Sequence, residues 1–195
     1  MGKLSKKTCD AWCRMMQRLN SRVLSLARQG QSNWVLDVPE GASLWEWVSA
    51  AFAQYDIQSA HLDLMGGHLR SAIFYTGYPD PAGKRIAQYG APNHTGHATL
   101  ISAMGIYGKD RDDKPLLHCH GCLVTGNGQT QGGHLDTQQC IVGQTGIRIY
   151  VTATSEIEFV ARLDATSGMY VFHPQLAEHI GGIADRAVVS AAHER

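Results

Sequence analysis

Short runs rich in apolar and β-branched residues recur along the chain after residue 30, and clusters of Gly, Pro, Asn and Asp separate them. This pattern is typical of half-buried β-strands separated by turns. It predicts strands over residues 34–38, 60–64, 71–76, 98–106, 116–124, 131–141, 147–153 and 157–163. Successive strands with short connections favour a largely antiparallel sheet.

One segment has the spacing of a helix instead. Its apolar residues recur at i, i+3 and i+4, at Leu44, Trp47, Val48, Ala51 and Phe52. Ser43 followed by Glu46 forms a capping box at the start of this pattern. We therefore expect an α+β fold, a mostly antiparallel sheet with one packed α-helix.

The two ends of the chain predict helical extensions of that domain. Residues 1–31 form a basic amphipathic extension, with Arg14, Arg18 and Arg22 at i, i+4 spacing on one face. Residues 156–195 predict a strand and then a helix over 176–193, packed on the domain. The central domain is expected to cover residues 32–155.

Length and charge bound the function classes. The 195 residues correspond to one domain plus extensions. The formal net charge is zero, but residues 1–30 hold seven basic residues against Asp10 alone, so they carry +6 and the remainder −6. An acidic body is a poor binder of nucleic-acid phosphates. The basic segment is open to three interpretations: a docking helix with a solvated face, contact with an acidic partner subunit, or nucleic-acid binding.

The sequence has no apolar run of about 18 residues, the length that spans a bilayer, and no signal peptide. It has five cysteines, an odd number in a chain large enough to fold without disulfides. We therefore expect a cytoplasmic protein with reduced thiols and no membrane partner.

The candidate chemistry lies between residues 116 and 136. His118 and His120 project from the same face of a predicted strand, because side chains alternate along it. The segment Gly126-Asn127-Gly128 predicts a tight turn. A hairpin centred on Asn127 places His120 opposite His134 and His118 opposite Asp136, so that all four cluster on one face.

Three imidazoles at this spacing predict a divalent metal site, with zinc as the choice by frequency. The alternative is histidines satisfied by ordinary hydrogen bonds. Asp136 is a candidate fourth ligand, or a group that orients an imidazole or moves a proton. Arg70 is a candidate clamp for a substrate carboxylate, or an ordinary surface arginine. The pair His94 and His97 is expected to be exposed to solvent, and a contribution to a second site is the alternative.

The segments Leu117-His118-Cys119-His120 and Gly132-Gly133-His134-Leu135, with the helix before them and Cys140-Ile141-Val142-Gly143 after them, resemble the plants-and-prokaryotes-conserved (PPC) domain. The resemblance spans about residues 32–155. It implies an antiparallel sheet flanked by a helix, a homotrimer, and a metal held by His118, His120 and His134. In plants the domain accompanies a separate Arg-Gly-Arg-Pro hook that contacts DNA, and this sequence has no such hook.

Three functional hypotheses follow. The first is a metal-dependent enzyme, a hydrolase or isomerase, that acts on a small carbonyl or carboxylate substrate. The second is a DNA-binding or transcription-associated protein that uses the domain for assembly and residues 1–30 for phosphates. The third is a metal-stabilised scaffold or a sensor of a small ligand.

Overall fold

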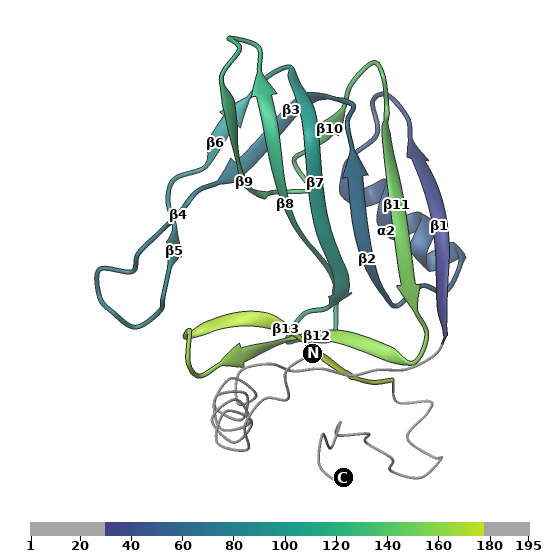
Figure 1. Ribbon diagram of the computed structural model, residues 1–195, viewed down its shortest axis with the longest axis vertical. Coiled ribbons are helices and arrows are strands. Elements are labelled where there is room, and N and C mark those ends of the chain that lie inside the picture. The colour runs from purple at the N-terminus through teal and green to yellow at the C-terminus, as the bar shows by residue number, and fades with distance from the viewer. Residues whose placement is uncertain (1–29, 178–195) are drawn as a thin grey trace, which may run out of the picture. The chain divides into compact units, whose positions relative to one another are not determined.

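The structure is a computed structural model that describes residues 30–177 (Figure 1). One sheet of eleven strands dominates it, with the order β1-β11-β2-β7-β8-β9-β3-β10. These strands and the helix are β1 (Gln31–Val38), α2 (Leu44–Gln54), β2 (Ser59–Met65), β3 (His68–Tyr75), β7 (Ala98–Lys109), β8 (Pro115–Thr125), β9 (Thr130–Leu135), β10 (Ile141–Val142) and β11 (Ile147–Thr154). All neighbours in this order pair antiparallel, so the predicted fold class is confirmed.

Five further strands complete the described part of the chain. β4 (Gly77–Tyr78) and β5 (Gln88–Tyr89) form a separate two-stranded arm, and β6 (Asn93–Thr95) pairs with β3. β12 (Ile157–Asp164) and β13 (Met169–Leu176) form a hairpin that joins the sheet through one parallel pairing of β12 with β7. Figure 1 shows the arm projecting beyond the sheet on the side of β6 and β9.

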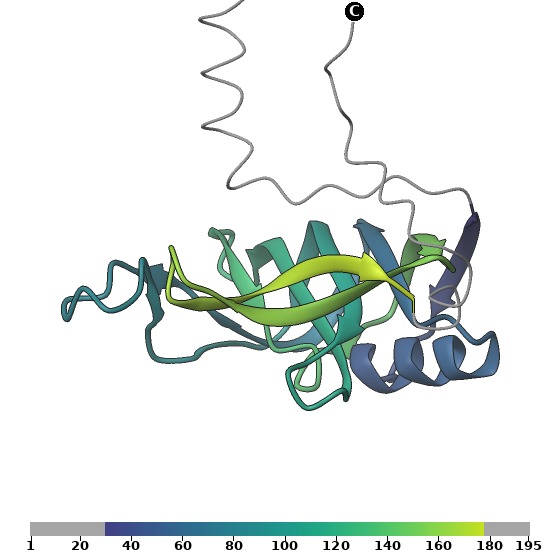
Figure 2. The same ribbon diagram turned by 90° about the horizontal axis from the view of Figure 1, so that it is seen from below.

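The helix α2 lies on one face of the sheet, as Figure 2 shows from the side. Ser43 caps it as the sequence predicts, because its Oγ accepts a hydrogen bond from the Glu46 N–H at 3.4 Å. Its apolar stripe packs Leu44, Val48 and Phe52 into the core, and each of these is at most 1% exposed. Phe52 meets the ring of Tyr107 on β7 edge to face, with centroids 4.7 Å apart. The helix thus fixes the face of the sheet on which the core forms.

The centre of the sheet closes on itself. β3 pairs with β9 through Phe74 and Leu135, and also with β7 through Leu69 and Ala98. Since β7, β8 and β9 are paired in sequence, these four strands form a closed circuit. Each strand of the circuit has hydrogen-bonded neighbours on both sides, which holds β8 and β9 in a defined position.

Several sequence predictions about element limits were wrong. The strand expected over residues 131–141 is broken, because the chain turns between Leu135 and Ile141, where Gln139 N–H bonds to Asp136 C=O at 2.9 Å. β4, β5, β6 and β13 were not predicted, and Leu176 ends β13 rather than starting a helix. The N-terminal helix and the rest of the C-terminal helix lie outside the described residues.

Within residues 30–177, no helix has the length and apolar character required to cross a membrane.

The packing of α2 predicts a large effect of one substitution. Phe52→Ala removes a ring that is fully buried against Tyr107. We expect the free energy of unfolding to fall by about 3–5 kcal/mol, because the substitution loses apolar burial and leaves a cavity. Trp47→Ala is the matched control, since Trp47 lies on the same helix but is 43% exposed, and its effect should be within about 1 kcal/mol. Urea denaturation of both variants measures the difference, and equal effects would contradict this packing.

Candidate metal centre

The hairpin β8–β9 positions the three predicted metal ligands. Its turn closes with the Gly128 N–H bonded to the Thr125 carbonyl at 2.8 Å, and Gly128 takes the positive φ of 79° that favours glycine. The register that follows pairs His120 with His134. His118 lies two residues from His120 on the same strand, so the expected convergence of the three histidines is confirmed.

Two glycines allow β9 to lie very close to its neighbours. A Cβ at Gly132 would lie 2.2 Å from the Gly121 carbonyl oxygen on β8, and one at Gly133 would lie 2.3 Å from the Tyr75 carbonyl oxygen on β3. No side chain fits at such distances. The backbone that carries His134 is therefore held between two strands.

The three imidazoles form a compact group on the sheet face opposite the core. The ring centroids of His118 lie 4.8 Å from His120 and 4.6 Å from His134, and those of His120 and His134 are 5.4 Å apart. The Nε2 atoms of His118 and His120 are 2.9 Å apart. One nitrogen from each of the three side chains lies within 4.8 Å of the other two.

Burial and mutual repulsion keep these rings neutral. Burial, together with the nearby His134 and His120, lowers the pKa of His118 from 6.5 to about 4. Burial also lowers the pKa of His120, and burial and then the proximity of His120 lower that of His134. A metal ion binds the neutral imidazole, so at neutral pH the group requires no deprotonation before it can coordinate.

The donor set fits a divalent transition metal. Tetrahedral coordination with Zn–N bonds of about 2.0–2.1 Å requires nitrogens about 3.3 Å apart. The His118 and His120 Nε2 atoms, 2.9 Å apart, lie near that spacing, and each of the three side chains has a nitrogen within 4.8 Å of the other two. The Nδ1 of His134 is buried and has no hydrogen-bond partner within residues 30–177, an arrangement that is costly for an ordinary structural histidine.

The surroundings of the group include residues that the sequence did not point to. Tyr89 of the arm stacks on the His134 ring, and Tyr75 of β3 lies 6.3 Å from it. Beside His120 there is a hollow of about 600 Å³. Its lining consists of His120, Asp63, Met65, Ser102, Ala103, Met104, Gly121, Cys122 and Gly133. Alternation along β2 puts Asp63 on the outer face, but its nearness to His120 depends on the strand order β2-β7-β8, which the sequence pattern does not contain.

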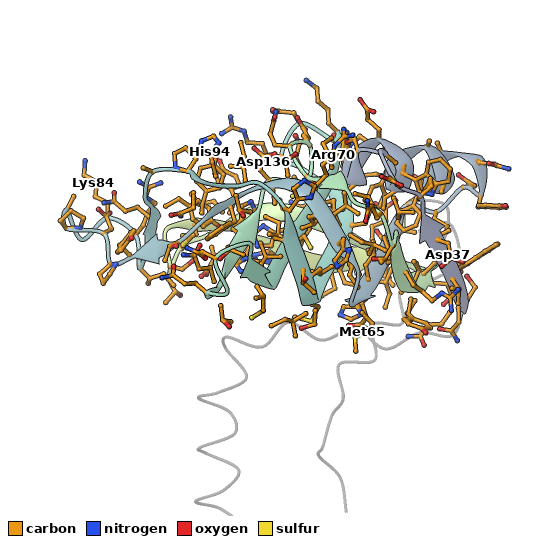
Figure 3. The ribbon with its side chains drawn as sticks, turned by 90° about the horizontal axis from the view of Figure 1, so that it is seen from above. Asp37, Met65, Arg70, Lys84, His94 and Asp136 are labelled. Atoms are coloured by element: carbon orange, nitrogen blue, oxygen red, sulfur yellow. The ribbon has the colours of Figure 1, made fainter. Side chains whose placement is uncertain are left out.

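Asp136 does not join the imidazoles, so the expectation that it faces His118 was wrong. The β8–β9 ladder ends at Cys119 and Leu135, and the Asp136 N–H bonds instead to the Ile73 carbonyl on β3 at 2.9 Å. The physical reason is that Leu135 pairs with Phe74, which draws the chain away from β8. Figure 3 places Asp136 on the same side of the sheet as α2, opposite Met65 of the hollow.

Arg70 is also separated from the hollow. It is exposed on β3, and Figure 3 labels it on the α2 side with Asp136. Its role as a carboxylate clamp stays a prediction that the arrangement does not favour. His94 and His97 are both exposed, as expected.

The comparisons with known proteins agree with the fold and the motif. The family model of the Plants and Prokaryotes Conserved (PCC) domain matches residues 26–152. The chain belongs to this family. The resemblance in the histidine and glycine segments is thereby confirmed, and the match covers all strands that carry the site.

Several solved structures share the architecture. A metal-containing protein from Archaeoglobus fulgidus is 22% identical over 77% of this chain and 98% of its own, with a TM-score of 0.60. A PPC protein from Pyrococcus horikoshii is 22% identical over 80% and 97%, with a TM-score of 0.57. A proposed DNA-binding protein from Ralstonia eutropha is 20% identical over 71% and 88%, with a TM-score of 0.56. At these identities the likeness is one of fold. Among the curated proteins there is no significant match.

The lowered pKa values predict how stability depends on pH in the metal-free protein. The folded state binds fewer protons than the unfolded state between pH 6.5 and about 4, because the folded pKa of His118 lies at the lower end of this range. The free energy of unfolding should therefore be highest above pH 6.5 and fall as the pH decreases through this range.

Urea midpoints measured across that range for the wild type, His118→Gln and His94→Gln test this expectation. His118→Gln should flatten the dependence, whereas His94→Gln, at an exposed position, should leave it unchanged. A wild-type midpoint that rises on acidification would contradict the assignment.

Proposed function

We propose that His118, His120 and His134 bind a divalent metal ion and leave one coordination position open. Several metals accept imidazole ligands, and zinc is chosen here because it is a frequent one. The observation that carries the proposal is the convergence of three neutral imidazole nitrogens within 4.8 Å on rigid strands. Structural zinc sites usually have four protein ligands, whereas three histidines and an open position are typical of catalytic sites. The group contains no fourth protein ligand among the described residues. The metal-containing relative from Archaeoglobus supports the proposal.

The hollow beside His120 supports an enzymatic role on a small carbonyl or carboxylate compound. When bound, the metal would polarise a carbonyl oxygen or lower the pKa of a water molecule. The side chains of Met65 and Met104 offer an apolar wall for the carbon skeleton of the substrate. Asp63 lines the same hollow and lies two strands from His120, about 9.5 Å across the ladder. Its carboxylate oxygen is a suitable acceptor for a proton released during hydrolysis or isomerisation.

The outer face of the sheet supports assembly with further copies of this chain, and we propose a homotrimer. Large apolar side chains lie exposed on it, among them Met65 at 59% and Met104 at 57%. Val35, Tyr150, Asp63 and Met104 follow one another across paired strands and lead to His120. A row of this kind across the sheet is unusual for a face that stays in water. Subunits packed there would enclose the hollow beside His120.

A DNA-binding role is the second candidate, favoured by the basic segment 1–30 and by the proposed DNA-binding relatives from Ralstonia and Bacteroides. The described body has eight Lys and Arg residues against thirteen Asp and Glu residues, which disfavours phosphate contacts there. This role would therefore depend on residues 1–30, and its affinity would fall steeply with salt. A metal-stabilised scaffold or a sensor of a small ligand is the third candidate function.

Elemental analysis of the purified protein tests the metal proposal. We expect about one zinc or similar ion per chain in the wild type. The variant His118→Ala, His120→Ala, His134→Ala should contain none, because all three ligands are gone. The control is His61→Ala, His94→Ala, His97→Ala, which removes three histidines outside the group and should retain the metal. A wild type that stays free of metal after reconstitution would refute the proposal.

The same proteins separate the enzyme from the scaffold. The metal-loaded wild type is screened with small esters, lactones and unsaturated keto acids, beside Asp63→Asn and the variant His118→Ala, His120→Ala, His134→Ala. Activity should vanish in the variant without the three ligands. In Asp63→Asn it should fall about 100-fold while the metal content persists. Metal binding that raises thermal stability without turnover of any of these compounds would favour the scaffold or sensor.

The trimer proposal predicts the effect of a charge on the outer face. Met104→Asp should convert a trimer into monomers in sedimentation at micromolar concentration, because it removes an apolar side chain from this row and places a second carboxylate beside Asp63. Leu163→Asp is the control, since Leu163 is equally exposed, at 58%, but lies on β12 and not in that row. A monomeric wild type would contradict the proposal.

A further inference from the structure

The arm formed by β4 and β5 has no part in the core, yet it reaches the histidine group. Its residue Tyr89 stacks on the His134 ring, with centroids 5.0 Å apart and an interplanar angle of 25°. The other ring contacts of His134 are more inclined, at 40° to Tyr75, 41° to His118 and 69° to His120. Tyr89 therefore makes the one nearly parallel contact with this imidazole among the described residues.

The orientation of the His134 ring depends on such contacts. A metal-ligating histidine usually holds its ring with the second nitrogen, which donates a hydrogen bond to a carboxylate or a carbonyl. Within residues 30–177 neither ring nitrogen of His134 makes a hydrogen bond, so whichever nitrogen binds the ion leaves the other without such a partner. The glycines beside it fix its backbone but not its two side-chain torsions. Among the rings around His134, the stacked ring of Tyr89 covers the imidazole face most nearly in parallel and can therefore restrict these torsions.

The arm itself is held at both ends. At its base the Gly90 N–H bonds to the Thr76 carbonyl at 3.0 Å, and Tyr78 packs over Gly90, where a Cβ would lie 2.5 Å from the Tyr78 ring. Farther along, the Ile86 N–H bonds to the Ser167 carbonyl in the turn between β12 and β13 at 2.8 Å. Figure 1 shows the arm and this hairpin turn on the same side of the sheet. Tyr89 is carried by a segment fixed between the sheet and the hairpin.

We propose that Tyr89 is a positioning residue of the metal centre, whose ring holds the His134 imidazole in the orientation that binds the ion. This inference rests on the proposed metal site. The arm thereby ties metal affinity to the β12–β13 hairpin, although neither element supplies a ligand. The contact requires an aromatic ring and not the phenolic hydroxyl, which has no hydrogen-bond partner among the described residues.

The test compares Tyr89→Ala and Tyr89→Phe with the wild type in the full-length chain. Zinc affinity is measured by competition with a chromogenic chelator, and the ligand field is followed by the absorption spectrum of the cobalt(II) form. We expect Tyr89→Ala to bind zinc about tenfold more weakly and to show a changed cobalt spectrum, because one imidazole is no longer held. Tyr89→Phe should match the wild type in both measurements.

The matched control is Tyr55→Ala. Tyr55 is 48% exposed against 44% for Tyr89, and its ring also pairs with an aromatic residue, Trp34, at 4.8 Å. It does not contact the histidines, so its loss should leave zinc affinity and the cobalt spectrum unchanged.

Two results would overturn the inference while the metal site stands. The first is a Tyr89→Ala variant with wild-type zinc affinity and cobalt spectrum. The second is a Tyr89→Phe variant that binds zinc as weakly as Tyr89→Ala, which would assign the effect to the hydroxyl. A wild type that binds neither ion would instead refute the proposed function itself.

Discussion

The register between β8 and β9 is the constraint on which the rest of the centre depends. With His120 opposite His134, three imidazoles face one side of the sheet. A shift of one residue would turn His134 toward the core and Leu135 toward solvent, since side chains alternate along a strand. The register is protected from both directions. Leu135 and Cys119 are buried on the core side, and the glycines of β9 fit only where they approach β8 and β3.

This geometry brings three imidazoles together in a partly buried place, where burial opposes the protonated, charged form of each ring. Each imidazole is partly removed from water and close to the other two, so protonation of one opposes protonation of its neighbours. In ordinary proteins such a cluster is a liability, because buried ring nitrogens without partners cost stability. A metal ion that accepts all three lone pairs removes that liability. Neutral imidazoles with free lone pairs are the form that the proposed metal ion would bind, and the hollow lined by His120 would give a small ligand access to it.

The sequence contained the local part of this arrangement and lacked the long-range part. Ser43 and Glu46 located the helix, and Gly126-Asn127-Gly128 located the turn that sets the register of the histidines. These features act over a few residues and have known chemistry. The failure at Asp136 has a different origin, because its place is decided by the pairing of Leu135 with Phe74, about sixty residues away in the chain. Asp63 and Tyr89 were missed for the same reason, since strand order and the path of the arm bring them to the histidines.

In the proposed centre, three imidazoles and no thiolate hold a metal ion that keeps an open position. X-ray absorption at the zinc edge of the reconstituted protein measures this directly. If the three imidazoles hold the ion, the spectrum shows three nitrogen scatterers at about 2.0–2.1 Å with the multiple-scattering pattern of imidazole, and one further light atom from solvent. A sulfur scatterer at about 2.3 Å would place Cys122 or another thiol on the ion, and fewer than three imidazoles would show that the histidine group does not act as one site.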